Sequence, residues 1–168
     1  DLARELVDAA FPDWTSAQKG AAMRPMAKLL EARLSILTAD IEAFHIKFGL
    51  EYSGPPRRLP LDLHQFRLKF MKEELDEDDE AYYMQDLHGQ FDALIDLGYV
   101  LFGTSYLHGF PYAQGWSRVQ SANMAKVRAE RAEDSKRGST FDVVKPPGWQ
   151  PPDLSDLLPP PEPEPELF

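Results

Sequence analysis

The stretch from Met71 to Asp96, MKEELDEDDEAYYMQDLHGQFDALID, decides the fold that we expect. It begins with an EExxE cluster and ends with two aspartates on an apolar segment. The acids concerned are Glu73, Glu74, Glu77, Asp92 and Asp96. Residues three or four apart share one face of an α-helix, so each group of acids would form a carboxylate face. Two such helices joined by a short connection can pack antiparallel and direct these faces at each other.

Helical periodicity continues on both sides of this stretch. Apolar residues recur every three or four positions from Pro25 to Gly49, which predicts a long helix that ends at the glycine. Further helices are expected over about residues 62–83, 84–107 and 111–132. The segment after Asp96 is almost wholly apolar, so the 84–107 helix is expected to be the most buried. Since no pair of strands is evident, the predicted fold class is an all-α helical bundle.

A polar and then proline-rich segment follows the last predicted helix. Residues 141–158 read FDVVKPPGWQPPDLSDLL, which combines prolines with aromatic and aliphatic side chains. This composition predicts an extended arm that lies on a body, either its own or a neighbour's. The tail from Pro159 to Glu166, PPPEPEPE, has no apolar surface to bury, so we expect no packed structure there.

The overall composition excludes several classes of protein. The 168-residue chain has a formal net charge of −10, which argues against a protein that coats nucleic-acid polymers. It contains no cysteine, so a disulfide framework, a thiolate metal site and a cysteine nucleophile are excluded. No stretch has the length and apolarity of a membrane span, and no signal-peptide pattern is present. We therefore expect a cytoplasmic protein with no membrane partner.

The acidic stretch permits two interpretations. Runs of charge usually form a solvated helix face, and we keep this interpretation for positions 76 and 78–80. Asp92 and Asp96 differ because they lie on an apolar segment, where a carboxylate is costly to bury unless it meets a cation or hydrogen-bond donors. Helices with facing carboxylates would also repel each other without a cation. The paired acids therefore favour a site for a hard divalent cation, with Mg²⁺ as the expected ion.

The acids resemble the signature of the MazG-like, all-α nucleoside triphosphate pyrophosphohydrolases, and in particular their phage-encoded, MazZ-like members. That signature consists of EExxE on one helix and ExxD on the next. The run from Glu73 to Glu77 matches the first half fully, and Asp96 matches the aspartate of the second half. The glutamate of ExxD would fall at Ala93. The nearest acid is Asp92, which either substitutes for that glutamate or supports another ligand.

The resemblance extends over about residues 38 to 155. Its further segments are DIEAFHIKFGL at 40–50, Phe66-Arg67, residues 103–109, SANMAK at 121–126 and DVVKPPGW at 142–149. It implies a catalytic helical domain at residues 38–132. Residues 1–37 would then be an N-terminal helical extension, and residues 133–168 the extended arm with its proline-rich tail.

The resemblance also implies the reaction. A nucleoside triphosphate is cleaved between the α- and β-phosphates to give the monophosphate and pyrophosphate. Two or more Mg²⁺ ions, for which Mn²⁺ can substitute, would be held by the acids. The implied metal ligands are Glu73, Glu74, Glu77 and Asp96, with Asp92 as an additional ligand or supporting group. One of the glutamates could instead hold the attacking water as a general base.

Four residues of the predicted helices are further candidates for substrate contact. The resemblance suggests that Asn123 and Lys126, which are three residues apart on one predicted helix, contact phosphate or sugar; ordinary surface positions are the alternative. Arg67 could reach phosphate or pair with an acid. His45 could line a base pocket, although a lone histidine is more often structural.

Two segments rich in proline carry other cations. Lys145 and Trp149 lie on the arm, where they could close over a nucleotide or pack the arm down. Arg57 and Arg58 lie in the Gly- and Pro-rich segment from residue 51 to residue 60. This segment is either a solvated connection, which we favour, or a loop that faces phosphate.

The resemblance guides the expectations for substrate and partners. Phage members that serve modified-purine DNA synthesis favour dGTP and GTP, so guanine nucleotides are the leading expectation, in the cytoplasm of a host cell. Family members are dimers or tetramers, and the apolar seam from Met26 to Phe48 suits an interface between subunits. Two alternatives stay open: a house-cleaning enzyme for dUTP or modified nucleotides, and a non-catalytic adaptor that binds a partner through its acidic face and arm.

Overall fold

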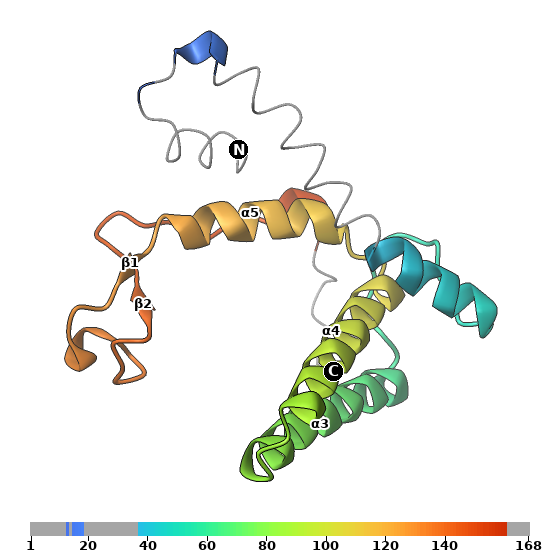
Figure 1. Ribbon diagram of the computed structural model, residues 1–168. Coiled ribbons are helices and arrows are strands. Elements are labelled where there is room, and N and C mark those ends of the chain that lie inside the picture. Colours follow the sequence, from blue (N-terminus) through green and yellow to red (C-terminus); the bar gives the residue numbers. More distant parts are fainter. Residues whose placement is uncertain (1–12, 14, 19–36, 161–168) are drawn as a thin grey trace, which may run out of the picture. The chain divides into compact units, whose positions relative to one another are not determined.

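The computed structural model describes residues 13, 15–18 and 37–160, and the chain divides into two compact units (Figure 1). One unit spans Arg33–Pro111; the other contains Tyr112–Phe168 together with Asp1–Ala32. The division falls within the predicted 38–132 domain. Most of the predicted N-terminal extension, residues 26–36 of the Met26 to Phe48 helix and most of the PPPEPEPE tail lie outside the described residues.

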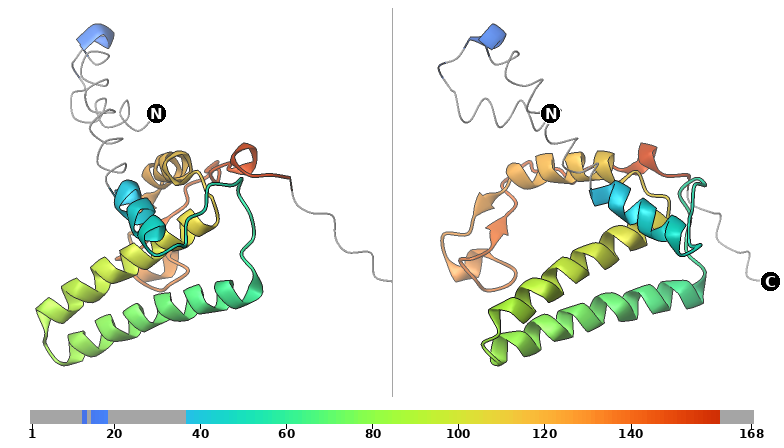
Figure 2. Two further views of the ribbon diagram at one scale, coloured as in Figure 1. Left: turned by 90° about the vertical axis from the view of Figure 1, so that its right-hand side faces the viewer. Right: turned by 45° about the vertical axis from the view of Figure 1, so that its right-hand side comes forward.

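The first unit is built on an antiparallel helical hairpin of α3 (Leu61–Tyr83) and α4 (Leu87–Leu107). The two helices meet at their connection and separate gradually toward the other end of the hairpin (Figure 2). Each contributes a row of buried or half-buried side chains at spacings of three or four residues. The rows are Leu63, Arg67, Phe70, Glu74, Asp78 and Ala81 on α3, and Gln90, Ala93, Leu97, Val100, Thr104 and Leu107 on α4. This spacing is that of a coiled-coil seam, as the sequence predicted for a hairpin.

A tight connection joins the two helices. Gln85 adopts a positive φ of 57°, which a non-glycine residue accepts in short turns. The Asp86 side chain then accepts hydrogen bonds from the backbone amides of His88 and Gly89, at 3.1 and 3.0 Å. Asp86 therefore caps the N-terminus of α4 and fixes where this helix begins.

The loop before α3 is fastened to the end of α4. The Arg57 amide donates to the His108 carbonyl at 2.9 Å, and the Arg57 guanidinium donates to the Leu107 carbonyl at 3.3 Å. The same guanidinium lies 3.6 Å from the centroid of the Tyr52 ring. Arg57 thus closes the C-terminus of a helix, which agrees with a connecting rather than a phosphate-facing loop.

A helix at residues 37–47 completes the first unit. Its Phe44 ring contacts Tyr99 of α4 edge-on, with ring centroids 5.4 Å apart. The residues after it turn at Gly49, whose φ is +67°, so the predicted helix end is confirmed.

The second unit contains α5 (Tyr112–Met124) and a two-stranded antiparallel ladder of β1 (Val127–Arg128) and β2 (Val143–Val144). Short 3₁₀ turns, η1 (Ala132–Asp134) and η2 (Ser155–Leu157), lie in the segments between and after the strands. The arm lies on its own α5: the Arg118 guanidinium forms a two-pronged ion pair with the Asp156 carboxylate. This ion pair joins the segment after the strands to α5 of the same unit.

The mostly helical fold confirms the all-α prediction, with one correction. The last helix ends at Met124 rather than near Ala132, because Val127 pairs with Val144 in the short ladder. Among α3, α4 and α5, α4 is the most buried, as predicted. Four of its residues are buried, against two on α3 and none on α5. None of the described helices has the length and apolarity to span a membrane.

Candidate functional site

The hairpin seam carries a buried glutamate where an apolar residue would be usual. Glu74 is 6% exposed and belongs to the buried row of α3. No described residue gives Glu74 a hydrogen bond or an ion pair. A carboxylate in such a position is costly unless a cation or a donor reaches it.

Four further carboxylates surround Glu74 electrostatically. Burial raises the pKa of Glu74, and the negative charges of Glu77, Asp96, Glu73 and Asp92 raise this pKa further, in that order. Two of these acids lie on α3 and two on α4, and all four are exposed. The charges of acids from both α3 and α4 therefore act on Glu74.

The side chains of the five acids do not meet at one point in this structure. Within the described parts of the chain, no three or more histidine, aspartate or glutamate side chains are close enough together to hold a metal ion. The donor set itself consists of five carboxylates, which are the hard oxygen ligands that Mg²⁺ prefers. A buried glutamate without a partner, among four exposed acids of the same charge, fits a divalent cation by its chemistry.

Arg67 lies two helical turns before Glu74 on the same row of α3, at about 10 Å along the helix. Its guanidinium donates to the Val100 carbonyl at 2.7 Å and to the Thr104 hydroxyl at 3.0 Å. Burial lowers the pKa of Arg67. The guanidinium thus connects α3 to α4 through neutral acceptors, and none of the described acids pairs with it. Of the two expectations for Arg67, pairing with a nearby acid is therefore not observed.

His45 is the most deeply buried polar side chain of the unit, at 2% exposure. Its Nδ1 lies 2.7 Å from the Ile41 carbonyl of its own helix, and its ring packs 4.7 Å from the Tyr106 ring. These contacts are those of a structural histidine.

Gly103 of α4 permits both buried side chains to pack there. A Cβ at this position would lie 2.9 Å from the Arg67 Nη2 and 3.0 Å from the His45 Cε1. Sequence reasoning included Gly103 only within a stretch of family resemblance and did not connect it with Arg67 or His45. A glycine inside an apolar helix is the signal that could have indicated this close approach.

The second unit brings together the other candidates. Lys126 donates to the Asn123 side-chain oxygen at 2.8 Å. The Lys126 and Lys145 ammonium groups lie 5.6 and 4.4 Å from the centroid of the Trp149 ring. Residues from the end of α5 and from the arm therefore form one cluster, although sequence reasoning assigned them separately.

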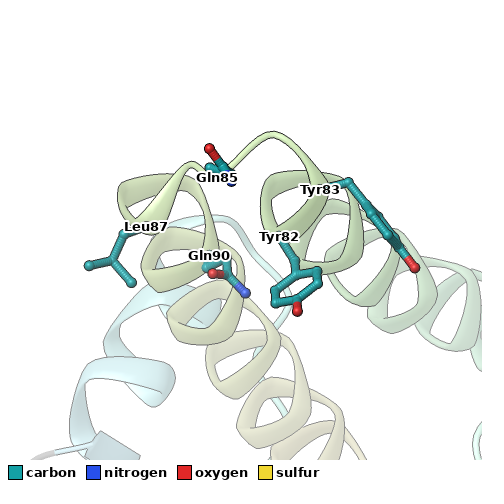
Figure 3. Close-up of a pocket in the computed structure, with 5 residues that line it drawn as sticks. All are labelled: Tyr82, Tyr83, Gln85, Leu87 and Gln90. Atoms are coloured by element: carbon teal, nitrogen blue, oxygen red, sulfur yellow. The ribbon is translucent and has the colours of Figure 1, made fainter.

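A pocket of about 390 Å³ lies at the connection between α3 and α4 (Figure 3). It is lined by Tyr82, Tyr83, Gln85, Leu87 and Gln90. Gln90 also donates to the Asp78 carboxylate across the hairpin at 3.4 Å. None of the predicted site residues lines this pocket, so it gives no support to the expected chemistry.

Comparison with known proteins adds one finding. Residues 41–123 match the model of the phosphoribosyl-ATP pyrophosphohydrolase family. This family lies in the all-α nucleoside triphosphate pyrophosphohydrolase superfamily, which the acidic motifs resemble. The matched segment includes all five acids, His45, Arg67 and Asn123, whereas Lys126 and Lys145 lie beyond it. No curated protein matches the chain.

Proposed function

We propose that the protein is a Mg²⁺-dependent nucleoside triphosphate pyrophosphohydrolase. Its substrate would be cleaved between the α- and β-phosphates to give the monophosphate and pyrophosphate. The observation that carries the proposal is the partnerless, buried Glu74 among four carboxylates from α3 and α4. The match to a pyrophosphohydrolase family over the same residues supports the class of reaction.

The acids of the hairpin would hold the metal. Glu73, Glu74, Glu77 and Asp96 are the proposed ligands, and Asp92 is the proposed supporting group or additional ligand. When bound, Mg²⁺ supplies positive charge for the phosphate oxygens and lowers the pKa of a coordinated water. One glutamate accepts a proton from the water that attacks phosphorus, and the bridging oxygen leaves with the pyrophosphate. Mn²⁺ would serve in place of Mg²⁺ because it accepts the same oxygen ligands.

The remaining candidates are proposed to contact the substrate. Asn123, Lys126 and Lys145 would bind phosphate or sugar, since their polar groups lie on the surface of the second unit. Arg67 and His45 are buried and make structural contacts, so we propose that they support the hairpin that holds the acids. A direct contact between either side chain and the substrate stays a prediction from the resemblance.

We propose dGTP and GTP as the substrates, in the cytoplasm. A panel tests this choice: all dNTPs and NTPs, dUTP and phosphoribosyl-ATP are incubated with the protein and Mg²⁺, and products are separated by ion-exchange chromatography. Faster release of dGMP or GMP with pyrophosphate supports guanine nucleotides. Preferred cleavage of dUTP favours house-cleaning, and preferred cleavage of phosphoribosyl-ATP favours the activity in the name of the matched family. No turnover of any compound with any divalent metal contradicts the enzyme proposal and favours the adaptor.

We also propose a homo-oligomer, either a dimer or a tetramer. A second row of apolar residues on α4 has the spacing of a coiled-coil seam and lies uncovered in the single chain: Leu87, Phe91, Leu94 and Leu101. Leu87 is 77% exposed and Phe91 67% exposed. Sedimentation equilibrium tests the proposal, because Phe91→Glu and Leu94→Glu would shift an oligomer toward the monomer. A wild-type chain that sediments as a monomer at all concentrations contradicts it.

A further inference from the structure

The second unit holds two lysine side chains around a single indole ring. The Lys145 ammonium lies 4.4 Å from the centroid of the Trp149 ring, and the Lys126 ammonium lies 5.6 Å from it. Neither lysine forms an ion pair with a described acid. By contrast, Arg118, Arg131 and Arg137 of the same unit are each paired with a carboxylate. The ammonium groups of both lysines can therefore bind an anion from solution.

The indole ring is held in place by features that do not involve the lysines. Trp149 follows Pro146-Pro147-Gly148, and its amide donates to the Pro146 carbonyl at 3.0 Å. Gly148 has a φ of +81°, which a type II turn requires at its third position. The indole Nε1 donates to the Ala122 carbonyl at 2.7 Å. Ala122 lies in the last turn of α5, where a carbonyl lacks a partner within the helix.

The face of the indole ring offsets the repulsion between the two neighbouring ammonium groups. Like charges repel, but the negative face of an indole attracts each ammonium group. The Lys126 side chain is restrained further by its hydrogen bond to Asn123. A lysine side chain otherwise loses rotamer entropy when a ligand orders it. The fixed ring therefore orders the two charges before a ligand arrives.

We propose that Trp149 is a positioning residue that holds Lys126 and Lys145 as a paired subsite for a diphosphate group. Two ammonium groups match two neighbouring phosphates, each of which accepts charge-assisted hydrogen bonds. The group is either part of a nucleotide or free pyrophosphate. This assignment rests on the proposed function, since it names the part of the substrate that the second unit binds.

Packing the arm down is the simpler role for Trp149, and the structure offers a way to separate the two roles. The arm is also fastened by the Arg118–Asp156 ion pair, which lies apart from the ring in the sequence and involves neither lysine. Trp149→Phe keeps an aromatic face and removes the hydrogen bond to Ala122. Trp149→Leu removes both, and Asp156→Asn loosens the arm and leaves the ring and the lysines intact.

The test measures binding of inorganic pyrophosphate by isothermal titration calorimetry in EDTA. EDTA removes divalent metal, so the pyrophosphate affinity reports on cationic groups of the protein. A lost charge-assisted contact of about 1.5 kcal/mol corresponds to a factor of about ten. We expect Lys126→Gln and Lys145→Gln each to weaken binding about tenfold, and Trp149→Leu to weaken it about two- to fivefold. Trp149→Phe, Asp156→Asn and the exposed control Lys136→Gln should stay within about twofold of wild type.

Several outcomes would overturn the assignment. These are absence of pyrophosphate binding by the wild type, unchanged binding in both lysine variants, equal losses in Trp149→Phe and Trp149→Leu, or an equal loss in Asp156→Asn. If pyrophosphate binds as expected but no nucleotide is hydrolysed, the subsite stands and the proposed function fails.

The source of the diphosphate is settled by steady-state kinetics on the hydrolysed nucleotide. If the subsite binds the substrate, Trp149→Leu raises KM by about the same factor by which it weakens pyrophosphate binding, and kcat stays unchanged. A subsite for the product leaves KM unchanged and weakens product inhibition by pyrophosphate. If neither KM nor product inhibition changes in an active Trp149→Leu variant, the diphosphate assignment is contradicted.

Discussion

The two units of the chain use acidic side chains in opposite ways. In the second unit, hydrogen bonds from Ser135, Val143 and Arg137 hold the pKa of Asp142 below its usual range. The Arg118 guanidinium does the same for Asp156. In the hairpin, burial and four neighbouring carboxylates raise the pKa of Glu74, and no described donor reaches it.

The difference separates acids that fold the chain from acids that await a ligand. Asp142 joins residues 129–143 by accepting from a serine, an arginine and the backbone, and its own carbonyl accepts from the Ala129 amide at 3.0 Å. Each donor lowers the free energy of the folded state. Glu74 raises the free energy of the folded state, because it adds an unpaired charge to the seam between two helices. A buried group that destabilises the fold is better explained by function than by packing.

The largest effect is expected for Glu74→Gln. Loss of a metal ligand or general base should lower the rate of nucleotide hydrolysis by about a hundredfold or more. The same substitution removes an unpaired buried charge, so the metal-free protein should unfold at a higher temperature than wild type. Hydrolysis assays with Mg²⁺ and thermal unfolding in EDTA measure the two effects.

Asp76→Asn is the matched control for this comparison. Asp76 lies on the same helix but is exposed and paired with Lys72 at 2.7 Å. Its loss should change activity by less than about twofold and stability by less than about 0.5 kcal/mol, the usual worth of such a pair. Equal effects of the two substitutions would show that the acidic stretch acts only through its total charge.

The packing of the hairpin is tested at two glycines of α4. A Cβ at Gly103 would lie 2.9 Å from the Arg67 guanidinium, so Gly103→Ala should lower the free energy of unfolding by roughly 1–3 kcal/mol. A Cβ at Gly98 meets nothing within 4 Å, so Gly98→Ala should raise it by up to about 1 kcal/mol through helix propensity. Urea unfolding measures both.

Each outcome at the glycines is informative. A neutral Gly103→Ala variant would mean that Arg67 moves aside without cost. Gly98 lies between Leu94 and Leu101 on the uncovered face of α4, so a destabilised Gly98→Ala variant would indicate that a second copy packs closely there.

A smaller effect on the free energy of unfolding is expected when the pH is lowered. The folded-state pKa of Asp142 is lowered, so its contribution to stability is fully present above the unfolded pKa of about 3.9 and is lost as the pH falls through the folded value. Unfolding free energies should therefore decrease below about pH 4. Asp142→Asn should be less stable than wild type at pH 7 and show a shallower decrease in acid. A parallel decrease in both proteins would contradict the stabilising role of this carboxylate.

The sequence predicted the hairpin and its acids because both depend on local helical spacing. The positions of Glu74, Asp92 and Asp96 follow from a period of 3.5 residues and a capped turn at Asp86, which are properties of neighbouring residues. The grouping of these acids could therefore be predicted. That Glu74 alone among the five acids is buried could not, since it depends on how α3 packs against α4.

The errors lie where distant residues compete with local preference. The sequence after Met124 retains helical character, yet Val127 pairs with Val144, which lies seventeen residues further along the chain. Local propensity carries no information about that partner. The exposed apolar residues of α4 illustrate a related limit: an apolar composition indicates that a surface will be covered, but not whether the same chain covers it.

The same limit applies to the cluster in the second unit. Asn123 and Lys126 were grouped because they are three residues apart, whereas Lys145 and Trp149 were assigned to the arm alone. The hydrogen bond from Trp149 to Ala122 brings the two segments together, and no sequence spacing predicts it.

The central claim is that the carboxylates around Glu74 hold a divalent cation. Electron paramagnetic resonance of Mn²⁺, titrated into wild type, Glu74→Gln and Asp76→Asn, tests it most directly. We predict that wild type and Asp76→Asn bind Mn²⁺ and that Glu74→Gln loses most of this binding. Equal binding by Glu74→Gln and wild type, or no binding by wild type with or without a nucleotide, would contradict the claim.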